Sequence, residues 1–175
     1  MDNALHSVFK HTIQDIYNSE KQIAAALPKM RDAAQNEDLR EALQNHLIET
    51  DGHVRRIEEV CRLLGFETGN VTCQATTGLI KEAQEMMREF PSGPSGDAAI
   101  IANAQKVEHY EICNYGTAIS WAEEMGHDKE AIKLLKETLK EESGANEKLN
   151  HIATHHVNKD AKEAEPVGSV RASLI

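Results

Sequence analysis

The sequence IANAQKVEHYEICNY, residues 101–115, decides the fold, because apolar residues recur in it every three or four positions. Ile101, Ile112 and Tyr115 share one face of the helix that this spacing predicts, and Glu108 falls on the same face. A buried carboxylate without a partner is costly, so Glu108 must lose its charge, meet a cation or bind a metal. The stretch therefore predicts an amphipathic helix that carries an acidic group into the core.

Three further long helices repeat this pattern, and each has one glutamate on its apolar face. We expect the four long helices at about residues 3–34, 36–64, 97–125 and 128–157, with Asn36, Asp97 and Asp128 as N-caps, Gly65 as a stop, and Glu20, Glu49, Glu108 and Glu142 as the inward glutamates. One inward carboxylate from each of four helices is the arrangement of a two-metal site inside a four-helix bundle.

A long connection, residues 66–96, separates the second long helix from the third. It contains a shorter amphipathic segment at about residues 76–90 and a Pro/Gly-rich loop at 91–96. A connection of this length lets the flanking helices run parallel. The predicted fold class is all-α: an up-down four-helix bundle, residues 1–158, with one long crossover that contains an extra short helix. The aperiodic residues 159–175 are expected to form a loosely ordered tail.

Composition agrees with a helical cytoplasmic protein. Apolar residues make up 40% of the chain and aromatic residues only 4%, a mix that favours helix over sheet. The formal net charge of −10 argues against a nucleic-acid partner. No signal peptide is predicted, because the first twenty residues contain no apolar stretch of the kind that a signal peptide needs. No membrane span is predicted, because the sequence has no run of about eighteen apolar residues. Three cysteines without a C-x-x-C pair indicate reduced thiols rather than disulfides or a thiolate zinc site.

The inward acidic residues have further possible ligands beside them. His53 follows Glu49 by four residues, and Glu111 follows Glu108 by three, so each pair shares a helix face. Carboxylate and imidazole together suit iron, manganese or zinc. Bridging carboxylates would hold two metals and leave open positions for dioxygen, peroxide or water. The candidate metal ligands are Glu20, Glu49, His53, Glu108, Glu111 and Glu142.

Other interpretations of these residues stay open from the sequence. The inward glutamates would also be satisfied by interhelical ion pairs with Lys21, Arg55 or Lys106. His46 is interpreted as a satisfied core residue, or else as an outer hydrogen-bond partner of a ligand. Glu141 is interpreted as an exposed neighbour of Glu142.

Four segments carry a family resemblance: DIYNSEKQ (15–22), HLIETDGH (46–53), AQKVEHYEI (104–112) and LLKETLKEE (134–142). They resemble the YciE/YciF-type family of ferritin-like proteins over about residues 4–158. The resemblance implies a ferritin-like bundle with an extra crossover helix, a homodimer, and a rubrerythrin-like two-metal site that most simply holds two iron ions. It also implies a bacterial protein associated with stress responses.

The resemblance implies the same ligands by position: Glu20, Glu49 with His53, Glu108 with Glu111, and Glu142. The chain departs from the general ferritin-like pattern, which places a histidine three residues after the glutamate on the second and fourth long helices. Here position 52 is Gly, with His53 one residue later, and position 145 is Ala. The second metal is therefore expected to depend on Glu111 or to be weakly held.

Two functions follow as hypotheses. The first is a dinuclear non-haem metal protein, with iron and with oxidase or peroxide-reducing activity. The alternative is a structural or interaction stress protein whose metal is structural or absent, and its motive is the incomplete set of histidines. Iron storage would need a multi-subunit shell, which nothing in the sequence indicates.

Overall fold

The computed structural model describes residues 4–165, which are almost entirely helical and contain no strand. The elements are α1 (Ala4–Ala33), α2 (Glu37–Leu64), α3 (Gln74–Glu89), α4 (Gly93–Glu124), α5 (Lys129–Ile152), a π-helical turn (Ala153–Val157) and α6 (Asn158–Glu163). The helix α1 continues past Pro28 to its end. The all-α class predicted from the sequence is confirmed.

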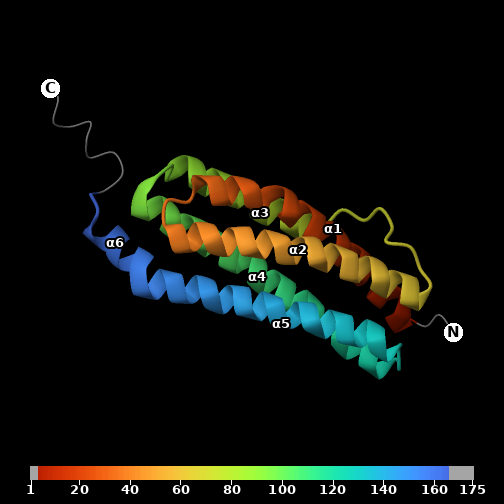
Figure 1. Cartoon of the computed structure of the whole chain (residues 1–175). Coiled ribbons are helices and arrows are strands. Elements are labelled where there is room, and N and C mark those ends of the chain that lie inside the picture. Colours follow the sequence, from red (N-terminus) through yellow and green to blue (C-terminus); the bar gives the residue numbers. More distant parts are fainter. Residues whose placement is uncertain (1–3, 166–175) are drawn as a thin grey trace.

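The four long helices form a ring in which each packs against two others. α1 packs on α2, α2 on α5, α5 on α4, and α4 on α1, while α3 covers α1 and α4 from outside. In Figure 1 the chain runs along α2 and α4 in the same direction, because α3 carries it back along the bundle between them. This is the predicted four-helix bundle with a long crossover and an extra helix.

Local side-chain caps explain where several helices begin and end. The Asn36 side chain accepts a hydrogen bond from the backbone N–H of Leu39, and Asp128 does the same for Glu130 and Ala131. Gly65 ends α2 with a φ of 75°, a left-handed conformation that glycine adopts without a steric penalty. These three predicted boundaries are confirmed.

The predicted start of the third long helix at Asp97 is wrong. The helix α4 begins at Gly93, inside the predicted loop, because Pro94 in the first helical turn loses no hydrogen bond there. The buried Asp97 carboxylate instead accepts hydrogen bonds from the backbone N–H groups of Gln35 and Asn36, at 2.8 and 2.9 Å. It therefore attaches the start of α4 to the turn between α1 and α2.

The end of the bundle also differs from the prediction. After α5 the chain makes a π-helical turn at Ala153–Val157 and continues as α6 to Glu163. Helical structure thus covers residues 159–163, which the sequence predicts to be part of the loosely ordered tail. Residues 166–175 of that predicted tail lie outside the described part of the chain.

Two apolar clusters fill the two ends of the bundle. One contains Phe9, Ile13, Ile16, Ile57, Tyr115 and Leu135, and the other contains Ile23, Leu27, Leu43, Ile101, Leu149 and Ile152. A layer of buried polar side chains separates them, since Glu20 on α1 lies between Ile16 of the first cluster and Ile23 of the second. The clusters shield this layer from water at both ends.

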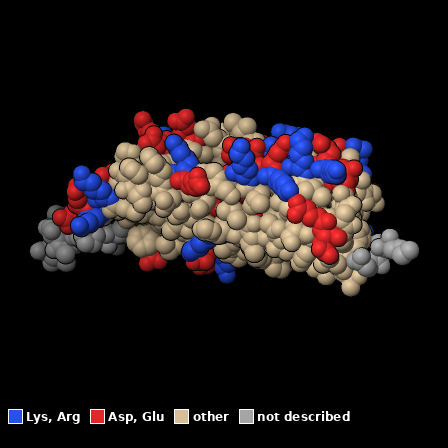
Figure 2. Space-filling model, turned by 90° about the horizontal axis from the view of Figure 1, so that it is seen from below, with Lys and Arg blue, Asp and Glu red and all other residues tan. Residues whose placement is uncertain are grey.

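One face of the described surface is mixed in charge. Figure 2 shows one face of the molecule, on which Lys and Arg side chains lie among Asp and Glu side chains rather than in one basic area. Within residues 4–165, no helix combines the length and the apolar character that crossing a membrane requires.

Candidate metal centre

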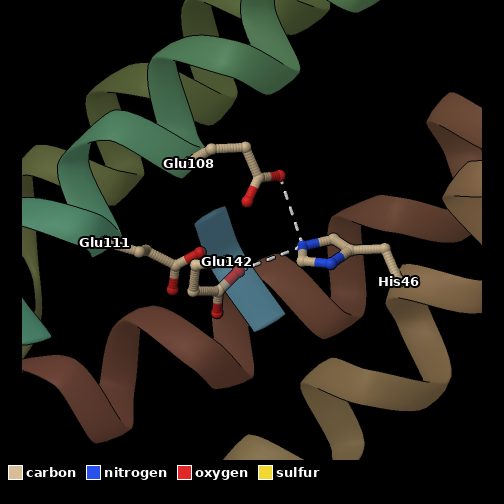
Figure 3. A group of neighbouring side chains, drawn as sticks. All are labelled: His46, Glu108, Glu111 and Glu142. Carbon is tan, nitrogen blue, oxygen red and sulfur yellow. Dashed lines mark ion pairs between the residues drawn. The ribbon is translucent and has the colours of Figure 1, made fainter. Parts of the chain in front are cut away.

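Two groups of buried side chains form the polar layer, and Glu142 belongs to both. The first is His46, Glu108, Glu111 and Glu142, and the second is Glu20, His53 and Glu142; in each group, one donor atom per residue lies within 4.8 Å of the others. Figure 3 shows the first group, with His46 of α2 pointing toward Glu108 of α4 and Glu142 of α5. Two donor groups with a shared carboxylate match the arrangement of a bridged two-metal site.

Helical spacing places the donors within each element. His46 and His53 are seven residues apart on α2, which is close to two full turns, so both rings face the bundle axis. Between them, the Thr50 hydroxyl donates to the His46 carbonyl oxygen at 2.8 Å and satisfies itself locally. Glu108 and Glu111 are three apart on α4, and both are 2% exposed.

The contacts inside the layer are close but geometrically incomplete. His46 Nε2 lies 3.3 Å from Glu108 Oε1 and 3.8 Å from Glu142 Oε2. His53 Nδ1 lies 2.8 Å from Glu142 Oε1 and 3.5 Å from Glu20 Oε2. The contact between His53 Nδ1 and Glu142 Oε1 is an ion pair when the imidazole is protonated, although neither atom makes a hydrogen bond of good geometry.

A second set of contacts, made by residues outside the two donor groups, orients His53 and Glu20. His53 Nε2 lies 2.9 Å from Glu141 Oε2, and the Arg56 guanidinium donates to both oxygens of Glu141 at 2.5 and 2.8 Å. The Tyr115 hydroxyl donates to Glu20 Oε1 at 2.5 Å. Such outer hydrogen bonds select the imidazole tautomer and hold a carboxylate in place, as they do around protein-bound metals.

Many donor atoms in this layer have no hydrogen-bond partner. They include both nitrogens of His46, both oxygens of Glu111 and Glu142, Glu20 Oε2, Glu108 Oε2 and His53 Nδ1. Buried polar atoms are normally paired, because an unmade hydrogen bond costs about 1–3 kcal/mol. Lone pairs of carboxylates and imidazoles that converge without partners fit a cation, so the residues present suit a metal.

The charges of the layer lead to the same conclusion. Burial raises the pKa of Glu20, and it raises the pKa of Glu108 and Glu111 well above the usual range. No Lys or Arg among residues 4–165 forms an ion pair with these carboxylates or with Glu142; Lys106 pairs with Glu82 instead. Burial lowers the pKa of His53, but Glu142 and Glu20 outweigh it and raise that pKa to about 11, so in the metal-free protein a protonated imidazole pairs with these carboxylates. The four buried glutamates would carry four negative charges when ionised, which two divalent cations would balance once the imidazoles lose their protons to bind metal.

The metal-free protein should lose stability as the pH rises from 6.5 to 9. Burial lowers the pKa of His46, but Glu108 and Glu49 outweigh it and raise that pKa to about 9 from 6.5. The folded state therefore binds more protons than the unfolded state between pH 6.5 and 9. For each proton that only the folded state binds, the free energy of unfolding falls by up to about 1.4 kcal/mol per pH unit as the pH rises. Glu141 and Glu142, whose pKa values are lowered, are ionised in both states here and do not oppose the trend.

Urea unfolding of chelator-treated protein at several pH values measures this effect. With metal bound the trend should reverse, because the ligands must be deprotonated to bind a cation. A midpoint in the metal-free protein that is flat or rises between pH 6.5 and 9 would contradict the assignment of these buried groups.

The structure brings together five of the six ligands predicted from the sequence and leaves Glu49 outside. The inward placement of Glu49 is wrong: its side chain is 44% exposed, and its Oε2 lies 3.6 Å from His46 Nδ1 on the outer side of that ring. At 100° per residue, Glu49 lies about 60° around α2 from His46, at the edge of the buried stripe rather than on it. His46 takes the inward position, where it is buried and lies in ion-pair distance of Glu108 and Glu142, although neither of its nitrogens makes a hydrogen bond.

A Glu49→Gln variant should therefore weaken metal binding only modestly, by less than about tenfold, the low end for residues that orient a ligand. Glu108→Gln, which removes a buried member of the cluster, should weaken it more. Titration calorimetry with manganese(II) compares the two variants. An equal loss in both would make Glu49 a direct ligand, as the sequence predicts.

A cavity of about 310 Å³ lies between α2 and α5 and reaches this part of the layer. Glu49, His46 and Glu108 line one side of it, and Gly144 and Ala145 line the other. Position 145 is where the ferritin-like pattern has a histidine. Two small residues of α5, Gly144 and Ala145, line the cavity there, and both imidazoles of the polar layer, His46 and His53, come from α2.

Sequence reasoning missed the supporting residues Glu141, Arg56 and Tyr115. The inward position of His46 could have been predicted from its spacing to His53, because two histidines seven residues apart lie on the same face of a helix. No comparable signal existed for Arg56 and Glu141, because they meet across 85 residues of sequence.

The chain is similar in sequence and in structure to several known helical proteins. The chain is 44% identical to protein YciF of Escherichia coli K12 over 159 residues, which are 90% of this chain and 95% of that protein. The crystal structure of that stress protein superposes with a TM-score of 0.85 at 43% identity, covering 90% of this chain and 99% of that one. YcfI of Rhodopseudomonas palustris, a proposed structural protein, gives a TM-score of 0.81 at 47% identity, covering 85% of this chain and 94% of that one.

A more distant protein from Xanthomonas campestris shares the fold, with a TM-score of 0.70 at 17% identity, over 91% of this chain and 97% of that one. The family described as "Domain of unknown function (DUF892)" matches residues 4–162, which include every residue of the polar layer. On these matches, the chain belongs to the DUF892 family of YciF-like, ferritin-like helical proteins.

Proposed function

We propose that this protein binds two iron ions in its polar layer and uses them to reduce dioxygen or peroxide during stress. The observation that carries the proposal is the pair of unpartnered donor groups that share Glu142. Mixed carboxylate and imidazole donors suit iron, with manganese or zinc as alternatives. When bound, iron would supply the electrons for the reduction.

Each buried residue would have a defined part. Glu142 would bridge the two positions, His53 and Glu20 would hold one metal, and His46 with Glu108 and Glu111 would hold the other. Tyr115 would fix the orientation of Glu20 through the hydrogen bond that it donates. Arg56, through Glu141, would fix the tautomer of His53. The apolar clusters on both sides would exclude bulk water and so strengthen every electrostatic contact in the layer.

The compartment, the oligomeric state and the physiological role of the protein are also part of the proposal. We propose that it is cytoplasmic, that it forms a homodimer, and that it takes part in a stress response. The support for the stress role is the E. coli relative, which is named a stress protein.

Anaerobic loading with iron(II), followed by dioxygen or peroxide, tests the proposal. We expect two iron ions per chain by elemental analysis, one for each donor group, and rapid oxidation that a Glu20→Ala/Glu142→Ala double variant does not show. Elemental analysis of protein purified without chelators would identify the metal that the cell supplies. Absence of bound metal, or oxidation no faster than in the double variant, would reject the proposal.

The second candidate is a structural or interaction protein whose metal is structural or absent. The description of the R. palustris relative as a proposed structural protein favours it. If removal of metal left the melting temperature unchanged and no oxidation were found, this alternative would replace the first. A metal that raised the melting temperature without any oxidation would indicate a structural metal.

A further inference from the structure

A second cavity lies beneath the crossover helix. It is bounded by α1, α3 and α4, and its side chains are mostly apolar, including Ile23, Leu27, Ile80, Ala83 and Val107. The buried residues His46 and Glu108 are among its lining residues, and they also line the cavity between α2 and α5. The same imidazole–carboxylate pair therefore lines both cavities, and only the cavity between α2 and α5 is also lined by Glu49, Glu141 and Lys148.

The polar side chains near this cavity do not make it a polar site. The buried Asn103 amide donates to the Ala99 carbonyl oxygen at 2.8 Å, and its oxygen accepts from Lys106. The exposed Lys29 and the half-buried Gln84 lie at its outer edge. Among all the residues that line this cavity, only His46 and Glu108 have buried polar atoms without a hydrogen-bond partner.

The size of the cavity limits what it can hold. Its volume is about 30 Å³, far below the volume of about 310 Å³ of the cavity between α2 and α5. A small cavity with a mostly apolar lining suits a small apolar molecule. Hydrogen peroxide would have to give up hydrogen bonds to water on entering an apolar cavity, at a cost of roughly 1–3 kcal/mol per unsatisfied group. Dioxygen has no such hydrogen bonds to lose.

We propose that the cavity beneath α3 is a dioxygen site that delivers this oxidant to the His46–Glu108 side of the metal centre. The inference rests on the proposed function and deepens it, because it names dioxygen as the oxidant served by a dedicated apolar path. Metal ions, water and peroxide would use the larger cavity between α2 and α5, which Glu49 and Lys148 border. The two cavities thus separate the apolar reactant from the polar ones.

Xenon, which occupies apolar protein cavities of suitable size, tests the site without any metal or turnover. Crystals of the metal-free protein under xenon pressure should show the atom beneath α3. An Ala83→Leu variant should lose it, because Ala83 is a buried alanine of α3 that faces the cavity. An Ala75→Leu variant, with the same change on the exposed side of α3, should keep it. Melting temperatures of both variants check that the fold is retained.

Kinetics of the iron(II)-loaded protein test the choice of oxidant. In Ala83→Leu the rate of oxidation by dioxygen should fall about tenfold or more, while the rate with hydrogen peroxide should change less than about twofold. An Ala42→Leu variant, which narrows the cavity between α2 and α5, should show the opposite preference. The ratio of the rate with dioxygen to the rate with hydrogen peroxide is compared between variants. This ratio cancels any effect of a substitution on the metals that changes both rates equally.

The outcomes separate this inference from the proposed function. Failure of the wild type to bind iron would reject the function and the dioxygen route with it. Iron binding and oxidation in the wild type, with no xenon beneath α3 or with equal loss of both rates in Ala83→Leu, would overturn the dioxygen route alone. If Ala83→Leu failed to fold, the wild-type xenon position and an Ala104→Val variant, which narrows the cavity from α4, would decide the question.

Discussion

A Glu142→Gln variant is expected to lose both metals, with an affinity at least about 100-fold below that of the wild type. Glu142 is the one residue that both donor groups share, and both of its oxygens are buried without a hydrogen-bond partner. Glutamine keeps the size of the side chain but removes the negative charge and one of the two donor oxygens. Because the remaining residues would form two separate and incomplete groups, neither metal position should survive.

Elemental analysis after dialysis and titration calorimetry measure this loss. The matched control is Glu147→Gln, the same change on the exposed side of α5, which should bind as the wild type does. Loss of only one metal in Glu142→Gln would show that the two positions do not share this carboxylate. Unchanged binding would place the metal elsewhere in the molecule.

A Glu111→Met variant is expected to make the metal-free protein more stable, by about 1–3 kcal/mol at pH 7. Glu111 is 2% exposed, and neither of its oxygens has a partner. Burial raises its pKa well above the usual range, so folding must either neutralise this group or bury its charge. Methionine is similar in length and fills the same space without a polar group to satisfy.

The same variant should bind metal more weakly, because Glu111 belongs to the donor group of His46. Urea unfolding of the chelator-treated proteins gives the stability, and Glu124→Met on the exposed end of α4 is the control, expected within about 0.5 kcal/mol of the wild type. A stability gain coupled to a loss of metal would mean that this carboxylate is kept for binding at a cost in stability. Destabilisation of the metal-free variant would show instead that Glu111 stabilises the fold.

The helices and their caps could be predicted because the determining interactions are local. Asn36, Gly65 and Asp128 act on backbone groups within a few residues of themselves, so their roles can be read from the adjacent sequence. Asp97 shows where this fails. It follows a Pro/Gly-rich stretch and has the chemistry of a cap, yet its carboxylate binds backbone groups some 60 residues away, and no local pattern contains that contact.

The candidate site divides in the same way. The four buried carboxylates and His53 were predicted because each interrupts or flanks an apolar stripe of its own helix. Glu49 satisfied the same rule and is nevertheless exposed, while His46 is buried. A stripe is wide enough to include residues about 60° apart, and the rotation of α2 against α5 and α4 determines which of them faces the axis.

By itself, the sequence determined that this protein is a bundle of four long helices with a crossover, and that acidic groups enter its core. That much follows from the 3.6-residue period and from the cost of burying charge. Only the tertiary structure decided which donors meet, that Glu142 joins two groups, that His46 rather than Glu49 faces the layer, and that two cavities lined by different helices both reach His46 and Glu108. These features depend on how helices distant in sequence rotate and pack against one another, which no single helix encodes.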